Sequence, residues 1–434
     1  MRSRPFVVLY AAVFVATMGI SMVSPLLPVY AERLGATGIW IGLTFSIFAV
    51  TQTVFGPFAG RWSDRWGRKP FIVAGLLLYF TAALGYLTAG SFWQVLAFRA
   101  LSGMGTSLIF SVARAYIGDL VPPRYEGRWF GVFATADIIG FGIGPVLAGL
   151  IRQVWGFDAV FIGMAALMAG SAAIVALLLP ARAGRAGGRA SLRPAELRFR
   201  EALADRLVLA LTLTMGLTSL SFGATFSFLA VRLEELGAGP ALTGVAFGAE
   251  SVASALVQPF AGQLADRVER RALLASGLGA SGVMLLVLGA AEHVGAVIAL
   301  MLLMGGAGAV SAVAGSAMQV VAGRRAGMGT VLGLGSAGNG VGIVAGSVSG
   351  GIMVDAFGLP WAFAFGGICV LAGSPSSSGW RGASPPTNSP SFRRRWPTPK
   401  AQGSVPQGAP PSPSVRRLPP RRSVLRGWPR RPRA

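Results

Sequence analysis

The stretch PFAGRWSDRWGRK, residues 57–69, returns later in the chain as PFAGQLADRVERR, residues 259–271. Both copies begin with Pro-Phe-Ala-Gly, continue to an Asp-Arg pair and end in a basic cluster, and they start 202 residues apart. These polar stretches interrupt a chain that is otherwise apolar, with 53% hydrophobic residues and a mean hydropathy of +0.62. The repetition predicts an internal duplication, in which equivalent connections join equivalent elements of two halves.

The composition indicates a membrane protein. Charged residues make up 12% of the 434 residues, which is about half the share of roughly 25% found in soluble proteins. The single cysteine, Cys369, excludes an internal disulfide and a cysteine-based metal site. The single histidine, His293, speaks against histidine-centred catalysis or a histidine metal cluster. We therefore expect no enzyme, no metal and no cofactor.

Apolar runs of about 20 residues, the length that crosses a bilayer core about 30 Å thick, recur along the chain. The convincing runs are 6–30, 39–59, 71–90, 93–118, 128–151, 158–180, 207–231, 241–261, 272–291, 294–321 and 329–353. A twelfth run, 359–373, is short for a span. The first run follows Arg2 and Arg4 but is too long for a signal peptide, so we interpret it as a retained helix.

The basic residues are distributed unevenly between alternate connections. With the N-terminus placed inside, most of them fall on inner segments, whereas the outer loops hold Arg33, Arg152 and Arg232. Cytoplasmic loops carry such an excess of lysine and arginine. The pattern predicts a multi-pass protein of the plasma (inner) membrane with a cytoplasmic N-terminus.

The polar segments predict the domain organisation. Residues 1–180 form an N-terminal six-helix bundle, 181–206 a cytosolic linker, 207–373 a C-terminal six-helix bundle, and 374–434 a tail. The offset of 202 holds outside the opening motif as well, because Glu32-Arg33-Leu34-Gly35-Ala36 matches Glu234-Glu235-Leu236-Gly237-Ala238. Two similar bundles in the same orientation are typical of one large class of transporters.

The first copy of the motif resembles the signature loop between helices 2 and 3 of the major facilitator superfamily, Gly-x-Leu-Ala-Asp-Arg-x-Gly-Arg-Arg/Lys. It departs from that pattern at Trp62 and Ser63, and the second copy has Glu269 in place of the second glycine. The resemblance implies an all-α membrane protein with twelve spans in two six-helix bundles. The positions that match are Gly60, Asp64, Arg65, Gly67, Arg68 and Lys69 in the first copy, and Gly262, Asp266 and Arg267 in the second.

The charges of this motif suggest a gate. Arg68 follows Asp64 by one helical turn, so the two can pair, and Asp119 is expected at a similar depth. Asp64 could also cap the N-terminus of the following helix. Our hypothesis is a cluster of Asp64, Arg68 and Asp119 that holds one conformation shut on the cytosolic side. The alternative is that these charges only set topology and solvate the surface.

The fifth span resembles the antiporter motif of the drug:proton antiporter branch, Gly-x8-Gly-x3-Gly-Pro-x2-Gly-Gly. Its members here are Gly131, Gly140, Gly144, Pro145 and Gly149, with Ala148 replacing one glycine. Small residues let membrane helices pack closely, and a Gly-Pro pair can bend a helix. The resemblance implies efflux by antiport, whereas the alternative is generic helix packing in a glycine-rich chain.

Charged residues at membrane depth are the candidates for proton coupling, because they usually face a cavity or a partner. Arg99 begins a sequence that resembles the family motif Arg-x-x-Gln-Gly, with Ser102 in place of glutamine, and the resemblance links it to coupling. Asp137 and Glu250 are acids that could carry protons. A structural pair of Asp137 with Arg99 is the alternative. Asn339 is the counterpart of Asp137 in the second half.

The expected substrate is a lipophilic, drug-like small molecule. The helices expected to line the cavity carry few charges but many hydroxyl, aromatic and methionine side chains. These residues are Ser21, Ser24, Thr51, Gln52, Thr218, Ser221, Thr225, Phe45, Phe48, Phe222, Phe226 and Met215. The other expected partners are protons and the lipid bilayer, with no nucleic acid, and we expect a monomer. The alternatives are a proton-coupled uptake symporter for a small metabolite and, more remotely, a non-transporting sensor.

The tail, residues 374–434, is rich in proline and arginine and contains no acidic residue. Such a composition predicts disorder. Because the preceding run stops short, we interpret the tail as the product of a shifted reading frame near Gly373. The alternative is a genuine basic segment that binds anionic lipid or nucleic acid.

Overall fold

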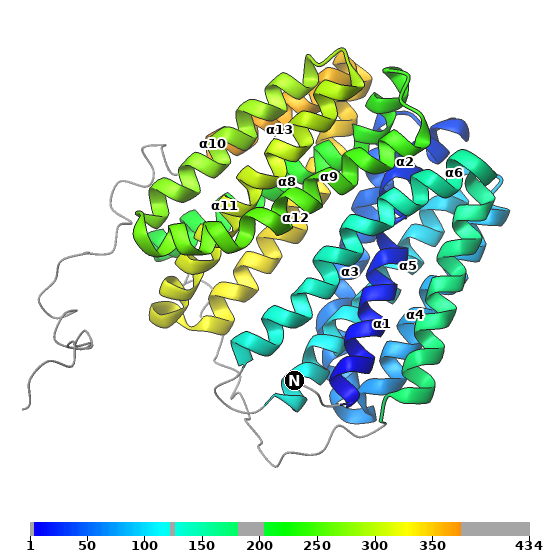
Figure 1. Ribbon diagram of the computed structural model, residues 1–434, viewed down its shortest axis with the longest axis vertical. Helices are drawn as coiled ribbons and strands as arrows, with labels where there is room; N and C mark the ends of the chain where they lie inside the picture. The colour runs from blue at the N-terminus through cyan, green and yellow to red at the C-terminus, as the bar shows by residue number, and fades with distance from the viewer. Residues whose placement is uncertain (1–3, 122–125, 181–203, 375–434) are drawn as a thin grey trace, which may run out of the picture. The chain divides into compact units, whose positions relative to one another are not determined.

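The computed structural model describes residues 4–121, 126–180 and 204–374, and in these ranges the secondary structure is helical throughout (Figure 1). The described residues all belong to one compact unit. The predicted linker, 181–206, and the predicted tail, 374–434, lie almost entirely outside the described residues. The helices are α1 (Arg4–Ser21), α2 (Val23–Arg33), α3 (Gly38–Trp66), α4 (Arg68–Thr88), α5 (Phe92–Leu120), α6 (Glu126–Leu178), α8 (Arg206–Glu235), α9 (Pro240–Arg267), α10 (Arg270–Gly289), α11 (Val294–Ala326), α12 (Met328–Phe357) and α13 (Leu359–Gly373).

The predicted spans are confirmed. The described helices include 10 that are long and apolar enough to cross a membrane, with α1 and α2 together forming the first. One of these, α6, bends at Gly156, whose φ of 83° is not helical, and so consists of two arms. Counting both arms and adding the shorter α13 gives twelve apolar helices, in the order that the sequence predicts.

The internal duplication is visible in the positions at which helices begin. Arg4 and Arg206 open the first span of each half, Gly38 and Pro240 the second, and the offset of 202 recurs in α4 and α10, α5 and α11, and α6 and α12. Two pairs of glycines with positive φ obey the same offset: Gly35 and Gly237, with φ of 82° and 80°, and Gly156 and Gly358. Only glycine adopts this conformation without strain, so both halves end their first span with the same turn.

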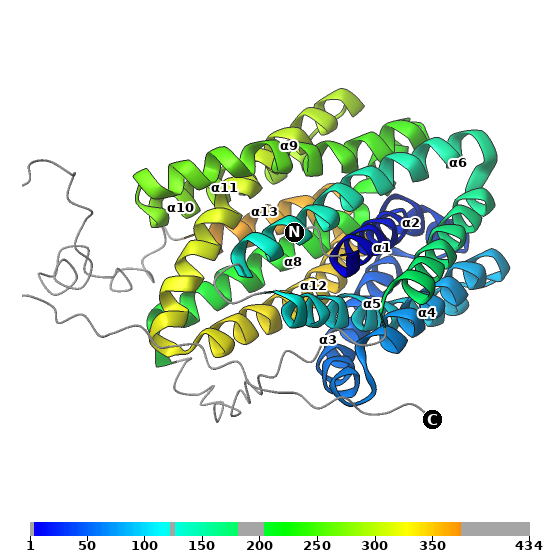
Figure 2. The same ribbon diagram turned by 60° about the horizontal axis from the view of Figure 1, so that its bottom comes forward.

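We call the end that carries the turns at Gly35, Gly156, Gly237 and Gly358 the outer end, and the opposite one the inner end, after the orientation that the charges predict. At the outer end the two halves are packed together. One buried apolar cluster there joins the halves, with Ile41 and Phe92 from the first and Phe226 and Phe228 from the second. In Figure 2, α6 runs beside α9, and these two helices are in contact.

At the inner end the halves are farther apart. A methyl group added at Gly131 of α6, or at its counterpart Gly333 of α12, would meet no atom within 4 Å. By contrast, a methyl group at Gly149 would meet the carbonyl of Pro240, near the outer end of α9. The structure is therefore closed at the outer end.

The last helix, α13, has 15 residues and still packs as a full member of its half. Its Phe363 is fully buried, and the carbonyl oxygen of its final residue, Gly373, accepts a hydrogen bond of 3.0 Å from the Thr214 hydroxyl on α8. These contacts attach both ends of α13 to the second half.

Candidate functional site

A cavity of about 640 Å³ lies between the two halves. Seven elements contribute side chains to it, so that both halves line it. The lining residues are Thr17, Gln52, Thr106, Ser107, Phe110, Ser111, Arg114, Asp137, Ile138, Phe141, Phe222, Phe226, Glu250, Ser251, Ser254 and Asn339. A mixed lining of aromatic and polar side chains is typical of a small-molecule site.

Two equivalent positions of this cavity carry different chemistry. In the first half, the Thr17 hydroxyl donates to the Asp137 carboxylate over 3.2 Å. In the second half, the Asn339 amide donates to the Ser219 hydroxyl over 2.8 Å. Thr17 and Ser219, like Asp137 and Asn339, are related by the offset of 202. The duplicated contact is thus retained in both halves, but only the first half keeps an ionisable group.

Two further charged residues line the cavity without a direct partner. Among the described residues, neither Glu250 nor Arg114 makes a hydrogen bond or an ion pair. Arg114 lines the same cavity as Asp137. Glu250 is fixed through its backbone, because its carbonyl packs directly against Gly305 of α11. Charged groups that lack partners are costly inside a membrane, and such a cost points to a functional role.

Arg99 lies apart from this cavity. Its Nε donates to the Thr44 carbonyl over 3.0 Å, and its guanidinium stacks on the rings of Phe45 and Phe48, at 5.3 and 4.4 Å. The side chain is only 4% exposed. The alternative pairing of Arg99 with Asp137 is therefore absent, since each residue has other partners.

The aromatic lining was predicted in part. Gln52, Phe222 and Phe226 do line the cavity, and the rings of Phe222 and Phe226 are stacked with centroids 4.0 Å apart. Phe45 and Phe48 pack on Arg99 instead. The sequence missed Phe110 and Phe141, which lie on the fourth and fifth spans. Their position next to the charged Arg114 and Asp137 along those helices was the available signal.

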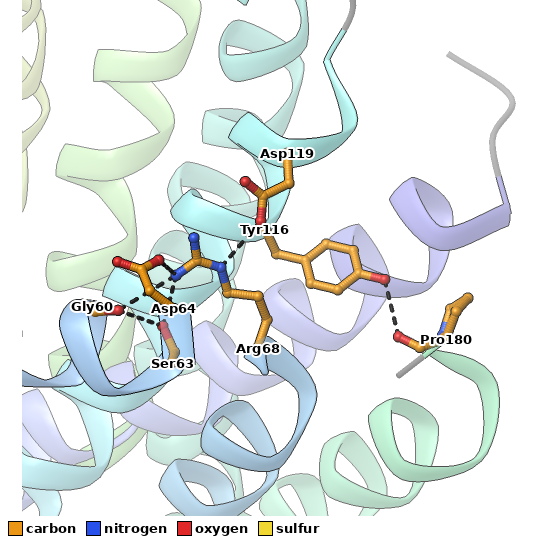
Figure 3. A network of polar contacts seen from close by, with 7 residues as sticks. All are labelled: Gly60, Ser63, Asp64, Arg68, Tyr116, Asp119 and Pro180. Atoms are coloured by element: carbon orange, nitrogen blue, oxygen red, sulfur yellow. Dashed lines mark hydrogen bonds and ion pairs between the residues drawn. The ribbon is translucent and has the colours of Figure 1, made fainter. Parts of the chain in front are cut away.

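The predicted charge cluster forms at the inner end of the first half, as Figure 3 shows. Arg68 is its centre: a terminal nitrogen lies 2.5 Å from the Asp64 carboxylate, and Nε lies 3.1 Å from Asp119. Arg68 also donates to the Ser63 hydroxyl over 2.7 Å, and that hydroxyl donates to the Gly60 carbonyl. The cluster therefore ties together α3, α4 and α5, all within one half.

The second copy of the motif lacks the partners that make this cluster. At the offset of 202, Ser63 becomes Ala265 and Asp119 becomes Val321. The side chain of Asp266 lies outside the described residues, Gly262 meets no close neighbour, and Arg267 is exposed. A polar network of the same kind therefore cannot be built in the second half.

The expectation that Asp64 caps the following helix is wrong. Helix α3 continues to Trp66, so Asp64 lies inside its last turns, and no side chain caps α4. The connection is Gly67 alone, with a φ of 95°. With a connection of only one residue, Asp64 pairs with Arg68, the first residue of α4, and does not accept hydrogen bonds from the free backbone amides at the start of α4. The neighbouring Arg65 and Lys69 make no hydrogen bond or ion pair to described residues.

The glycines of the fifth span act as close contacts. A methyl group at Gly144 would meet the hydroxyl of Ser21 and the carbonyl of Met18 in α1. Gly140 packs against the same helix, with Phe14 O at 3.0 Å from the position of an added methyl. Gly131 makes no such contact, and α6 runs through Pro145 without a break. The motif thus joins α6 to α1 over part of its length.

The fold and cavity together define a class: a multi-pass membrane protein of two related helical halves with a cavity between them. The family model of the Major Facilitator Superfamily matches the chain twice, at residues 9–233 and 211–426. The chain belongs to this family.

The chain is also similar to individual members of the family. It is 33% identical over 154 residues to an uncharacterised MFS-type transporter of Methanocaldococcus jannaschii, a match that covers 36% of this chain and 40% of that protein. It is 30% identical over 152 residues to the quinolone resistance protein NorA of Staphylococcus aureus, covering 35% of this chain and 39% of NorA. The matched regions therefore span about two fifths of these relatives.

Solved structures share the fold. A bacterial homologue of the human lysosomal transporter Spinster, in an inward-facing and unoccupied conformation, has a TM-score of 0.67 at 15% identity and covers 86% of this chain and 95% of its own. The human organic anion transporter MFSD10 has a TM-score of 0.59 at 21% identity and covers 85% of this chain and 98% of its own. At these identities the likeness concerns the fold alone.

Proposed function

We propose that the protein exports lipophilic, drug-like small molecules in exchange for protons, by alternating access, from the cytoplasm across the plasma (inner) membrane. In this proposal the N-terminus is cytoplasmic, protons and the substrate are the partners, and one chain is sufficient. The similarity to the quinolone resistance protein NorA supports export as the direction.

The observation that carries the proposal is the pair of acids in the cavity between the halves. Asp137 comes from the first half and Glu250 from the second, and aromatic side chains surround them. An acid that faces the substrate cavity can bind either a proton or a cationic substrate, which couples the two by competition. The second half has Asn339 at the position of Asp137, which supports a proton site in only the first half at this level of the cavity.

The other predicted site residues have supporting roles in the proposal. The cluster around Arg68 fixes the inner ends of α3, α4 and α5 as one unit, so that the first half moves as a rigid body. Gly140 and Gly144 let α6 slide and tilt on α1. Arg99, packed between the second and fourth spans, is proposed to influence coupling through Thr44 and Phe48 rather than by contact with the substrate.

The test is gradient-driven transport of ethidium, a lipophilic cation, in inverted vesicles that contain the full chain. We expect ethidium to enter vesicles with an acidic interior and to be released when a protonophore collapses the gradient. Vesicles with the Asp137→Asn, Glu250→Gln double variant are the control and should show passive entry only. Equal uptake with and without the gradient would contradict proton coupling.

The same assay separates export from the alternative, uptake by symport. An exporter accumulates its substrate in vesicles whose interior is acidic. A symporter in the same inverted vesicles would instead drive its substrate out with the protons. Depletion of a preloaded substrate on acidification of the interior would therefore favour the symporter.

A further inference from the structure

At the outer end, a side chain from the second half caps a helix of the first. The Asp355 carboxylate at the end of α12 accepts hydrogen bonds from the backbone amides of Gly38, at 2.7 Å, and Ile39, at 2.9 Å. The Thr37 hydroxyl donates to the same carboxylate over 3.3 Å. These amides open α3 and have no partners within their own helix. The cap is thus completed by the other half of the molecule.

The reverse contact exists on the other side of the cavity. There the Gln153 side-chain oxygen, near the outer end of the first arm of α6, accepts a hydrogen bond from the backbone amide of Ala241, at 3.2 Å. Ala241 is in the first turn of α9 in the second half. Gln153 and Asp355 are related by the offset of 202, and so are Ile39 and Ala241. The two contacts form a symmetric pair in which each half caps a helix of its partner.

Both caps depend on a close approach of backbones. A methyl group at Gly38 would lie 2.8 Å from the carbonyl of Gly351, one turn before Asp355. On the other side, a methyl group at Gly149, one turn before Gln153, would meet the carbonyl of Pro240. The backbones of the two halves therefore come so close at these points that no side chain fits between them. Both caps need this close approach, so they can form only while the outer end is closed.

An ion pair strengthens the side that has the weaker, neutral cap. Arg152, next to Gln153, lies 2.5 Å from Glu234 of the second half, and the Arg152 side chain is only 6% exposed. Its guanidinium also stacks on Phe157, at 4.2 Å. At the offset of 202, the residue equivalent to Arg152 is Val354, so the Asp355 side has no such pair. Each side of the cavity therefore has one charged contact between the halves: the Asp355 cap on one side and the Arg152–Glu234 ion pair on the other.

We infer that Asp355 and Gln153 are paired gate residues, which hold the outer end closed by capping α3 and α9 across the interface. When the outer end opens, the amides of Gly38, Ile39 and Ala241 lose these acceptors and turn to water instead. The loss is small enough to be reversible in each cycle and large enough to set the balance of the two states. This inference rests on the proposed alternating access but needs no particular substrate.

The experiment measures the accessibility of the cavity from each side of the membrane. In a Cys369→Ser background, Ser254→Cys places one thiol in the cavity lining. A membrane-impermeant maleimide is applied to right-side-out and to inverted vesicles of the full-length protein. For Asp355→Ala we expect labelling from the outer side to rise about fivefold and labelling from the inner side to fall, since one lost cap shifts the equilibrium by about that factor.

Two further variants show that the cap is responsible. Asp355→Asn keeps one acceptor oxygen, as Gln153 has, and should show a smaller shift than Asp355→Ala. Gln153→Ala should shift labelling in the same direction. The matched control is Asp158→Ala, which removes an exposed acid at the same end that makes no hydrogen bond to described residues of the other half.

The opposite changes on the two sides distinguish a gate from damage to the fold. A rise of labelling from both sides in Asp355→Ala, or no change from either, would overturn the inference. Because labelling needs neither substrate nor a proton gradient, a failure of ethidium transport leaves this result independent. If the unmutated protein failed to transport ethidium but Asp355→Ala still gave opposite labelling changes on the two sides, the gate would be supported and the proposed substrate rejected.

Discussion

At the scale of single residues, the polar network around Arg68 illustrates what a motif can and cannot predict. The sequence predicts that Asp64, Arg68 and Asp119 meet, because Arg68 follows Asp64 by the length of one helical turn and Asp119 is expected at a similar depth, and they do meet. It does not predict that Ser63 takes part in the network, because Ser63 departs from the family pattern. Its role depends on the tilt of α4, which a linear pattern does not contain.

The first prediction concerns the carboxylate of this network. Asp64→Asn should insert normally and keep its stability within about 1 kcal/mol, because the Asp64 side chain is 58% exposed and exposed ion pairs contribute little. Transport should nevertheless be lost, since Arg68 no longer bridges two acids. Thermal unfolding in detergent and ethidium uptake in vesicles measure the two effects. Full transport by Asp64→Asn would reject the proposed role of the cluster in holding the inner ends of α3, α4 and α5 together during transport.

The matched control for this prediction is Ser63→Ala. It removes the neutral partner of Arg68 but leaves both ion pairs in place. We expect it to lose less transport than Asp64→Asn. Equal loss in the two variants would mean that packing at the inner end of α3, rather than charge, is what matters.

The second prediction concerns Asp137, whose counterpart in the second half is the neutral Asn339. Asp137→Asn gives both halves the same neutral group at this level of the cavity. We expect gradient-driven uptake to fall at least tenfold, while exchange of labelled for unlabelled ethidium without a gradient continues, because exchange moves no net proton. Asp137→Glu, which keeps a carboxylate, should retain part of the coupling. Uncoupled exchange that fell as much as driven uptake would instead assign Asp137 to substrate binding.

At the scale of the elements, the helices follow from the sequence because a bilayer demands long apolar runs with every backbone group bonded internally. The boundaries that were missed have a physical cause. The sequence ends the second span before the charged motif, but α3 carries that motif to Trp66, where a helix leaving the membrane can remain helical in water. Likewise, one positive-φ glycine is enough to join the two arms of α6, with no loop between them.

The third prediction tests how the glycines of α6 act. Gly144→Ala should destabilise the protein by about 1–3 kcal/mol, because the added methyl group overpacks the contact with α1 and displaces the buried Ser21 hydroxyl. Gly131→Ala is the matched control in the same motif and the same helix, where a methyl group meets no neighbour. It should be neutral or stabilising by up to about 1 kcal/mol.

Thermal unfolding of the two alanine variants in the same detergent decides the third prediction. A contact role predicts a lower melting temperature for Gly144→Ala alone. If both variants melted together below the parent protein, the glycines would act through backbone flexibility along the whole motif and not through the contact with α1.

At the scale of the whole molecule, the repeat predicts more than it first suggests. The offset of 202 relates the two copies of the motif, the starts of the helices and the caps at the outer end. The sequence alone cannot show which conformation the molecule adopts, because both states of a transporter use the same helices. Only the contacts between halves, such as those of Gly149 and Gly351, reveal that the outer end is closed.

The fourth prediction concerns the ion pair between the halves. Arg152→Ala and Glu234→Ala should each lower stability by more than 1 kcal/mol, because each leaves a largely buried partner charge alone. The double variant should cost less than the sum of the two, which a double-mutant cycle of thermal unfolding measures. Glu235→Ala is the control, since Glu235 pairs with Arg232 within α8 and is about half exposed. Additive effects of Arg152→Ala and Glu234→Ala would mean that the pair does not couple the halves.

The shortness of α13 has a consequence for the lipids around the protein. At 1.5 Å per residue, 15 residues measure about 22 Å, against about 30 Å for the hydrocarbon layer. We expect the surrounding lipid to thin beside this helix, at a cost that grows with each ångström of mismatch. Because α13 lies on one side of the second half only, that strain is unsymmetrical, and membranes of short-chain lipids should suit this protein better than thick ones.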